Sequence, residues 1–374
     1  MITLIATCAM GIEAVLAREL KALGYTNFKT DNGRIEVYGE LLDLCKCNVW
    51  LRTAGRVYLK VAEFKATTFD ELFDQTKRVP WSDWIGKEDQ FPISKISSRH
   101  SKLFAKSNSQ SIVKKAVAEA LQQQHHTQTL SETGAEYAIR VQIERDIVTL
   151  SIDTTGEGLH KRGYRDVGSR APLRETLAAS LIYLSRWNPE RDILLDPLCG
   201  SGTLLIEAGL MAHNIAPGLN RRFVSESWKA IPSELWKTCR DDAKSKINTA
   251  ITPKIMGSDC DGQVLSIARQ NIAKAGLSDV FVQTLDVKDC GSKSRYGKVI
   301  TNPPYGERLG ELEAVEDLYR DMGDAFKQTL SDWDYYVLTP HLEFESLFGK
   351  RSTKNRKLFN GPIQCYFYSF FGKS

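Results

Sequence analysis

Residues 298–310, KVITNPPYGERLG, combine residue types that are unusual at the end of a strand. Pro303 biases Asn302 toward an extended backbone, and the fixed φ angles of Pro303 and Pro304 hold their carbonyl groups in a rigid frame. The side-chain oxygen of Asn302 and a rigid backbone carbonyl can both accept hydrogen bonds from one amino group. The ring of Tyr305 offers a face on which a planar base can stack. The segment therefore predicts a site for an exocyclic amine; a proline turn that only caps a strand is the alternative interpretation.

The chemistry that these residues favour is transfer of a methyl group to nitrogen. When both N–H groups of an amine are accepted, its lone pair can point at a methyl donor, and such alignment is most of the catalytic task. No strong general base is needed, because the proton can leave after the amine has become cationic. The predicted catalytic residues are Asn302, Pro303, Pro304 and Tyr305.

A glycine-containing loop in residues 196–209, DPLCGSGTLLIEAG, lies between a strand-like and a helix-like run. Gly200 and Gly202 allow the backbone to approach a ligand closely. The third glycine of the dinucleotide fingerprint is replaced by Leu205, and no Gly-Lys-Ser/Thr follows, so neither a dehydrogenase nor a P-loop enzyme is indicated. A tight turn without a ligand is the alternative.

Four strand-like runs in this half of the chain end in a polar residue: Asp196, Asp259, Asp286 and Asn302. In an open α/β sheet, ligands bind outside the carboxyl ends of the strands. Asp196 would repel a phosphate and suits a cationic ligand. Asp259 follows the strand whose end carries the ribose-binding acid in such folds, and Asp286 is placed to meet an adenine edge. A ligand with ribose, adenine and positive charge but no phosphate is S-adenosylmethionine.

The elements that must position these residues form an α/β domain. From about residue 160 onward, strand-like and helix-like runs alternate, which favours a doubly wound, mostly parallel sheet. The predicted strands are DILLD, PKIMGSD, VFVQTLD, GKVITN and DYYVLTP. Residues 215–250 interrupt this alternation, and their role does not follow from the sequence.

The preceding half of the chain has a different pattern of strand-like and helix-like runs. Residues 2–60 are predicted to form β-α-β-α-β, and the pattern up to residue 155 is also α+β. Hairpin turns are expected at residues 32–33, 144–146 and, in the C-terminal half, 360–362. We expect three domains, with boundaries at 1–65, 66–158 and 159–374.

Basic residues gather in three segments, residues 99–115, 161–174 and 349–361. Each is either a solvated face or a contact to an RNA backbone, since Lys and Arg supply the sequence-independent part of nucleic-acid affinity. The predicted RNA contacts are Lys102, Lys106, Lys114, Lys115, Lys161, Arg162 and Arg165.

The composition is that of an ordinary globular protein. The chain has 374 residues, 42% hydrophobic and 26% charged, with a net charge of +4 that permits a nucleic-acid partner without requiring one. No apolar run approaches the length of a membrane span, and the first residues lack the basic start of a signal peptide. The eight cysteines include no Cys-x-x-Cys pair. We therefore expect a cytoplasmic protein without a metal site.

The motifs DPLCGSGT and NPPYGERLG together resemble class I S-adenosylmethionine-dependent methyltransferases that act on exocyclic amines of bases. The N-terminal half and the junction GLHKRGYR…APLRETLAA resemble the THUMP-containing RNA methyltransferases, in particular the bacterial 23S rRNA guanine-N2 methyltransferase family in its short form with one methyltransferase domain. The resemblance implies a ferredoxin-like domain, a THUMP domain and a Rossmann-like methyltransferase domain. It also implies a cofactor site made of Asp196, Gly200, Ser201, Gly202, Asp259, Asp286 and Asn302.

The function implied by this resemblance is methylation of a guanine N2 amine in 23S rRNA. A guanine-N2 methyltransferase that acts on tRNA fits the same motifs. A DNA adenine-N6 or cytosine-N4 methyltransferase also fits residues 302–305, but the long α+β N-terminal half lacks a helix-turn-helix pattern. The non-enzymatic alternative is an RNA-binding ribosome-assembly factor, which the intact motifs disfavour.

Overall fold

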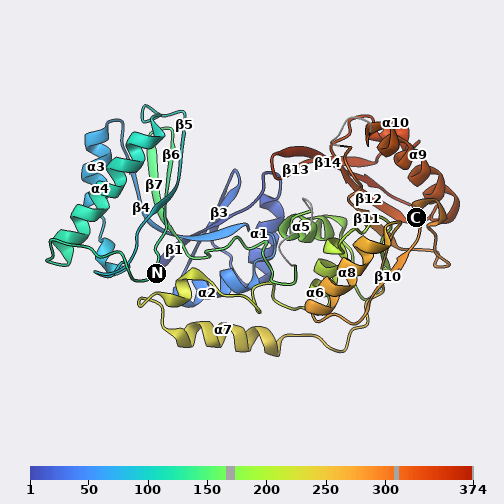
Figure 1. Ribbon diagram of the computed structural model, residues 1–374, viewed down its shortest axis with the longest axis horizontal. Helices are drawn as coiled ribbons and strands as arrows, with labels where there is room; N and C mark the ends of the chain where they lie inside the picture. The colour runs from blue at the N-terminus through green and yellow to red at the C-terminus, as the bar shows by residue number, and fades with distance from the viewer. Residues whose placement is uncertain (166–172, 307–310, 373–374) are drawn as a thin grey trace.

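Two seven-stranded sheets organise the protein. The computed structural model describes residues 1–165, 173–306 and 311–372. The N-terminal sheet has the strand order β2-β3-β1-β4-β7-β6-β5, so the two N-terminal units share one continuous sheet (Figure 1). Its strands are β1 (Ile2–Thr7), β2 (Phe28–Asp31), β3 (Arg34–Gly39), β4 (Arg56–Lys65), β5 (Ile93–Arg99), β6 (Ile139–Glu144) and β7 (Ile147–Asp153).

One face of this sheet is apolar and covered by helices. Burial alternates along β6, where Ile139, Val141 and Ile143 are buried while Arg140 and Gln142 are not. Such alternation places every second side chain on the opposite face. The helices of this half are α1 (Glu13–Ala22), α2 (Leu41–Trp50), α3 (Phe69–Lys77), η1 (Trp81–Asp83) and α4 (Lys106–Gln124).

The C-terminal sheet is doubly wound, as the alternation of elements predicts. Its order is β10-β9-β8-β11-β12-β14-β13. The first five strands in this order run parallel, and β14 is antiparallel to β12. The chain order reverses between β8 and β11, and such a switch point is where α/β sheets bind ligands. The strands are β8 (Leu194–Asp196), β9 (Ile255–Asp259), β10 (Val280–Thr284), β11 (Lys298–Thr301), β12 (Asp334–Thr339), β13 (Lys354–Asn360) and β14 (Ile363–Phe370).

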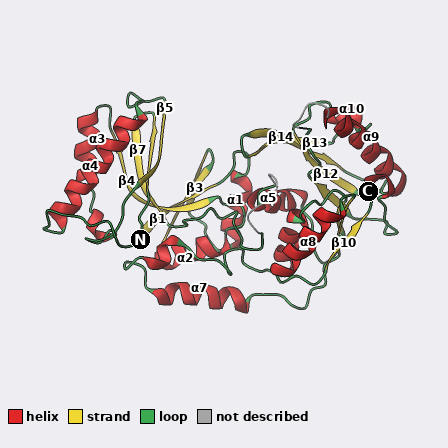
Figure 2. Cartoon of the chain, viewed as in Figure 1, coloured by secondary structure: helices red, strands yellow, loops and turns green. Residues whose placement is uncertain are grey.

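Helices cover both faces of the C-terminal sheet (Figures 1 and 2). One apolar cluster joins the sheet to α5, α6 and α8, and a second, aromatic cluster joins it to α9 and α10. The helices are α5 (Glu175–Ser185), α6 (Thr203–Ala212), η2 (Val224–Ser227), α7 (Ser233–Ser245), α8 (Gly262–Lys274), η3 (Val287–Asp289), α9 (Glu311–Thr329) and α10 (Phe344–Leu347).

The predicted hairpins are present. β2 and β3 pair around residues 32–33, β6 and β7 around 145–146, and β13 and β14 around 361–362. Most of the basic segment 349–361 therefore belongs to strand β13 rather than to a loop. Within the described residues, no helix combines the length and the apolar character needed to cross a membrane.

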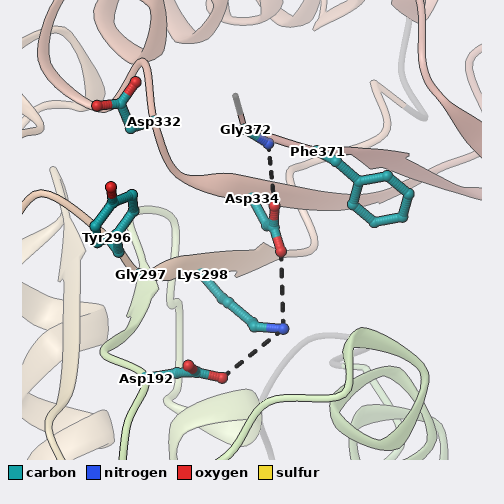
Figure 3. Close-up of a pocket in the computed structure, with 8 residues that line it drawn as sticks. All are labelled: Asp192, Tyr296, Gly297, Lys298, Asp332, Asp334, Phe371 and Gly372. Atoms are coloured by element: carbon teal, nitrogen blue, oxygen red, sulfur yellow. Dashed lines mark hydrogen bonds and ion pairs between the residues drawn. The ribbon is translucent and has the colours of Figure 1, made fainter. Parts of the chain in front are cut away.

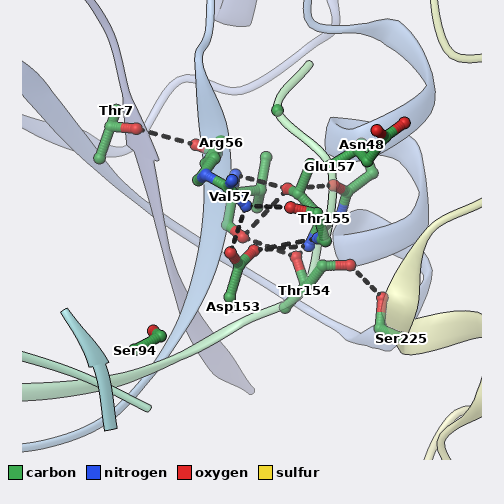
Figure 4. Close-up of polar contacts among 12 residues, drawn as sticks. Thr7, Asn48, Arg56, Val57, Ser94, Asp153, Thr154, Thr155, Glu157 and Ser225 are labelled. Atoms are coloured by element: carbon green, nitrogen blue, oxygen red, sulfur yellow. Dashed lines mark hydrogen bonds and ion pairs between the residues drawn. The ribbon is translucent and has the colours of Figure 1, made fainter. Parts of the chain in front are cut away.

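The segment 215–250 fastens the two halves of the molecule together. Its aromatic side chains belong to the N-terminal core, where Trp228 stacks on Tyr137 at a centroid distance of 4.4 Å. The Trp228 indole N–H donates to the carbonyl of Glu136 at 3.0 Å. Ser225 donates to the carbonyl of Thr154 (Figure 4), and α7 packs along α2. An insertion in the C-terminal half therefore completes the core of the N-terminal half.

Candidate active site

The glycine loop follows β8 at the carboxyl edge of the C-terminal sheet. Gly200 and Gly202 have φ angles of +51° and +82°, and Gly202 is the N-cap of α6. Side chains other than glycine rarely adopt this backbone region. A Cβ built on Gly200 would meet no atom within 4 Å, so the space over the loop is open to a ligand. Asn271 of α8 holds the loop by donating to the carbonyl of Ser201 at 3.1 Å.

Three acids that the sequence predicts for the cofactor site lie at or just beyond the carboxyl ends of β8, β9 and β10. Asp196 is only 2% exposed and accepts from the Leu198 amide at 3.2 Å. Burial raises the pKa of Asp196 to about 7, and the charge of Asp259 adds to the rise. The Asp259 carboxylate accepts from the Gly200 amide at 3.0 Å and thereby joins β9 to the glycine loop. Asp286 is exposed just beyond β10 and accepts from the Lys288 amide at 3.0 Å.

Asn302 is the first residue after β11, beside β8 at the switch point. The Tyr305 hydroxyl donates to Asn302 Oδ1 at 2.6 Å. Burial raises the pKa of the Tyr305 phenol, so the phenol is neutral and remains a donor. The Tyr305 ring packs against the apolar cluster of α5, α6 and α8. The expectation that Tyr305 presents its ring to a base stays a prediction; in this conformation its hydroxyl is held by the amide that was expected to bind the substrate.

Two residues that sequence reasoning missed support this motif. Buried Tyr319 of α9 donates to the Pro304 carbonyl at 3.1 Å and lies 2.8 Å from the Thr339 hydroxyl. Asn360, at the end of β13, lies with its amide nitrogen 3.4 Å from the Tyr305 hydroxyl. Neither residue lies near residues 302–305 in the sequence, so only the packing of α9 and β13 reveals them.

The junction arginines hold helix α6 instead of facing solvent. Arg162 is buried against Glu207 at 3.3 Å, and the Tyr164 hydroxyl donates to the same carboxylate at 3.1 Å. Arg165 pairs with buried Glu175 at 3.3 Å, and it also contacts the Thr203 hydroxyl. The prediction that Arg162 and Arg165 contact RNA is corrected: α6 carries the glycine loop, and both guanidinium groups are used to position it.

The remaining predicted RNA contacts, which lie on α4 and in two loops, divide in the same way. The Lys114 ammonium lies 2.7 Å from the Glu132 carboxylate and 3.4 Å from the centroid of the Phe91 ring, so it is occupied within the protein. The side chains of Lys102, Lys106, Lys115 and Lys161 are exposed. Helix α4 lies on the side of the N-terminal sheet that faces away from the C-terminal half (Figure 1). An RNA role for these four lysines stays a prediction.

A further hollow, of about 410 Å³, lies at the opposite edge of the C-terminal sheet. Lys298, at the start of β11, pairs there with Asp192 at 3.8 Å and Asp334 at 3.7 Å (Figure 3). This pairing ties the amino ends of β11 and β12 together, far from the glycine loop. Over residues 1–165, 173–306 and 311–372, no group of three or more His, Cys, Asp or Glu side chains is arranged to hold a metal ion.

Comparison with known proteins identifies three regions. Residues 162–369 match the family described as "RMKL-like, methyltransferase domain", residues 3–58 match the "RlmL ferredoxin-like domain", and residues 66–153 match the THUMP domain. The chain is 45% identical to the putative RNA methyltransferase YpsC of Bacillus subtilis, over 99% of this chain and 96% of that protein.

Other relatives support the same assignment. SMU.472, a putative methyltransferase solved in complex with SAH, is 40% identical with a TM-score of 0.93, over 100% of this chain and 98% of that one. A ribosomal RNA large subunit methyltransferase K/L from Marinomonas is 33% identical over 97% of this chain. The chain spans only about half the length of this and similar K/L relatives.

The donor set at the switch point fits the cofactor of such enzymes. A buried acid, an open glycine loop and a second acid on that loop suit a cationic ribonucleoside without phosphates. The chain belongs to the RMKL-like methyltransferase family, with a ferredoxin-like domain and a THUMP domain before its catalytic domain, and its cofactor is S-adenosylmethionine.

Proposed function

We propose that this protein methylates the exocyclic N2 amine of a guanine in large-subunit ribosomal RNA. The observation that carries the proposal is Asn302, which follows β11 directly and lies beside the strand that ends in Asp196. The THUMP match and the names of the K/L relatives support an RNA substrate of this class. The choice of guanine N2 rests on the resemblance of residues 302–305 and of the chain as a whole.

S-adenosylmethionine, when bound, supplies the electrophilic methyl group. In the proposed site Asp196 faces its cationic end, the loop at residues 200–202 lies along it, and Asp259 and Asp286 receive its ribose and its adenine. Asn302 Oδ1 and the carbonyl of Pro303 accept the two N–H bonds of the target amine. The lone pair of the amine is then directed toward the cofactor side of the site, which is the alignment that methyl transfer requires.

The Tyr305 hydroxyl already uses the acceptor that the amine would use. It donates to Asn302 Oδ1 at 2.6 Å and so takes one of the two lone pairs of that oxygen. Rotation of Tyr305 would free the amide and turn its ring toward the incoming base. The base itself must leave its helix to reach the site, as in other enzymes that modify a base. The proposed catalytic residues remain Asn302, Pro303, Pro304 and Tyr305.

Labelled S-adenosylmethionine and unmodified RNA test the proposal. The protein is incubated separately with 23S rRNA, 16S rRNA and tRNA, and the modified nucleoside is identified by mass spectrometry. N2-methylguanine in 23S rRNA alone is the expected result. Label in tRNA would favour the tRNA alternative, and cofactor binding without transfer to any RNA would favour an assembly factor. Asn302→Ala is the control: it should lower the transfer rate by about 10²–10³ and leave cofactor affinity nearly unchanged.

The proposal has two further parts, the cellular location and the division into domains. We place the reaction in the cytoplasm, where ribosomal RNA is made and modified. The division into units 1–65, 66–158 and 159–374 is retained as a proposal, with residues 215–250 as the segment of the third unit that packs into the first two.

A further inference from the structure

The face of the N-terminal sheet that α3 and α4 do not cover is turned toward the methyltransferase domain (Figure 1). Residues directly opposite each other on neighbouring strands share a face. Register therefore places Lys95 of β5 beside Arg140 of β6, and Tyr58 of β4 beside Asp153 of β7. Val141 and Ile143, which alternate with Arg140 and Gln142 along β6, are buried and point to the helix-covered side of the sheet. The open face thus carries the cations Lys95 and Arg140 beside the ring of Tyr58 and the acid Asp153.

A cleft of about 750 Å³ lies between this face and the methyltransferase domain. All three domains line it, and the lining includes Tyr58, Lys95, Arg140, His160, Arg174 and Asn360. Asn360 is the contact between the cleft and the catalytic motif, since its amide nitrogen lies 3.4 Å from the hydroxyl of Tyr305. An RNA strand that lies in the cleft would therefore pass next to the proposed base pocket.

Arg140 is the unusual residue of this cleft. Its guanidinium carbon lies 4.9 Å from the centroid of the Tyr58 ring, and its Nε is buried without a hydrogen-bond partner among the described residues. The neighbouring Arg56 differs, because it pairs with Asp153 and the Gly156 carbonyl (Figure 4). A partly buried guanidinium that lacks such partners is unfavourable for folding. The position is explained if an external anion completes it.

The charge around Arg140 favours an anion. Burial and the nearby Arg174 and Lys161 lower the pKa of His160 to about 4, so His160 is neutral at pH 7, and Asp153, an acid in the lining, is paired with Arg56. Lys95 is exposed beside Arg140. A guanidinium presents a planar fork of N–H donors that matches two phosphate oxygens at once. The cleft therefore suits a chain of phosphates better than a carboxylate ligand.

We propose that Arg140, stacked on Tyr58, is an anchor for a backbone phosphate of the RNA strand that carries the target base. The anchor rests on the proposed function for the identity of its RNA. It assigns substrate positioning to the open face of the sheet, whereas Lys106, Lys114 and Lys115, which were predicted from the sequence, lie on α4, on the other face. Arg140 is a positioning residue, since it does not reach the reacting atoms.

The test is RNA binding by the full-length chain, measured by fluorescence anisotropy with labelled oligouridylate over a range of salt concentrations. Arg140→Ala is expected to weaken binding about tenfold and to lower the salt slope by about 0.7, the value for one lost phosphate contact on a single strand. Arg78→Ala is the matched control. It removes the same charge at the exposed end of α3, on the helix-covered side, and should change neither quantity.

Thermal unfolding separates this role from a structural one. An anchor whose Nε has no hydrogen-bond partner among the described residues predicts an unchanged or higher Tm for Arg140→Ala, whereas a packing role predicts a lower one. Arg140→Gln keeps most of the side-chain bulk on Tyr58 and should show the same loss of RNA affinity. Unchanged affinity and salt slope in both variants would overturn the anchor. Competition by inorganic phosphate as effective as competition by RNA would overturn it too, because the site would then hold small anions.

The two proposals fail differently. Wild-type protein that binds oligouridylate through Arg140 but transfers no methyl group to guanine would refute the proposed function and leave the anchor standing. Wild-type protein that methylates rRNA, with Arg140→Ala equally active at limiting RNA, would refute the anchor alone. Cofactor affinity should be the same in wild type, Arg140→Ala and Arg78→Ala.

Discussion

Asp196 should couple cofactor binding to pH. The carboxyl group is 2% exposed, and burial raises its pKa to about 7. In the free protein it is then about half ionised at pH 7 and about one tenth ionised at pH 6. A cationic cofactor binds the ionised form better. Because only the ionised fraction is ready to bind, the affinity for S-adenosylmethionine should fall about fivefold, or about 1 kcal/mol, from pH 7 to pH 6.

Isothermal titration calorimetry can measure this coupling directly. Titrations at pH 6 and pH 7, each in two buffers of different ionisation enthalpy, give the number of protons released on binding. About 0.9 proton is expected at pH 6 and about 0.5 at pH 7, because binding must ionise the protonated fraction. The α-amino group of the cofactor is mostly protonated throughout this window and adds little.

Asp196→Asn is the matched control, since it keeps the shape of the side chain and cannot ionise. Its affinity should be lower at pH 7, nearly constant between pH 6 and pH 7, and without proton release. The folded-state pKa lies above the ordinary value of 3.8, so the stability that the neutral carboxyl contributes is lost as pH rises through about 7. Equal wild-type affinities at pH 6 and pH 7, with no proton release, would refute the assignment of Asp196 to the cofactor.

Three further outcomes are expected. Tyr305→Phe removes the hydroxyl that donates to Asn302 Oδ1 but keeps the ring, so single-turnover methyl transfer should be as fast as in wild type or faster. A loss of rate as large as that of Tyr305→Ala would show that the hydroxyl itself is needed. Trp228→Ala should lower the free energy of unfolding, measured with urea, by about 3–5 kcal/mol, because Trp228 is buried in the N-terminal core. A change below about 1 kcal/mol would contradict the inference that residues 215–250 stabilise the contact between the two halves. Glu207→Ala leaves Arg162 buried without its carboxylate and should destabilise the protein by about 3–5 kcal/mol in the same denaturation assay. Glu207→Gln should destabilise it less. Equal stability of the alanine variant and wild type would show that the buried pair is not needed.

Local patterns in the sequence predict most of the fold. Period-two alternation, helical periodicity and turn residues depend on neighbours a few positions apart, so they are visible without a structure. The three hairpins and the doubly wound sheet follow from them. The four strand-end residues, Asp196, Asp259, Asp286 and Asn302, are predictable for a related reason, because parallel strands bring their carboxyl ends to one edge.

The use of each charged or aromatic side chain was decided only by tertiary structure. Arg162 and Arg140 are both arginines, yet Arg162 is buried against Glu207, whereas Arg140 lies over the ring of Tyr58 with an Nε that has no hydrogen-bond partner among the described residues. Whether a guanidinium meets a carboxylate, a ring or solvent depends on residues far away in the chain. For the same reason the amide–phenol contact of Asn302 and Tyr305 could not be foreseen: the sequence determined which groups stand at the site, and the packing around them decided which of those groups are free to act.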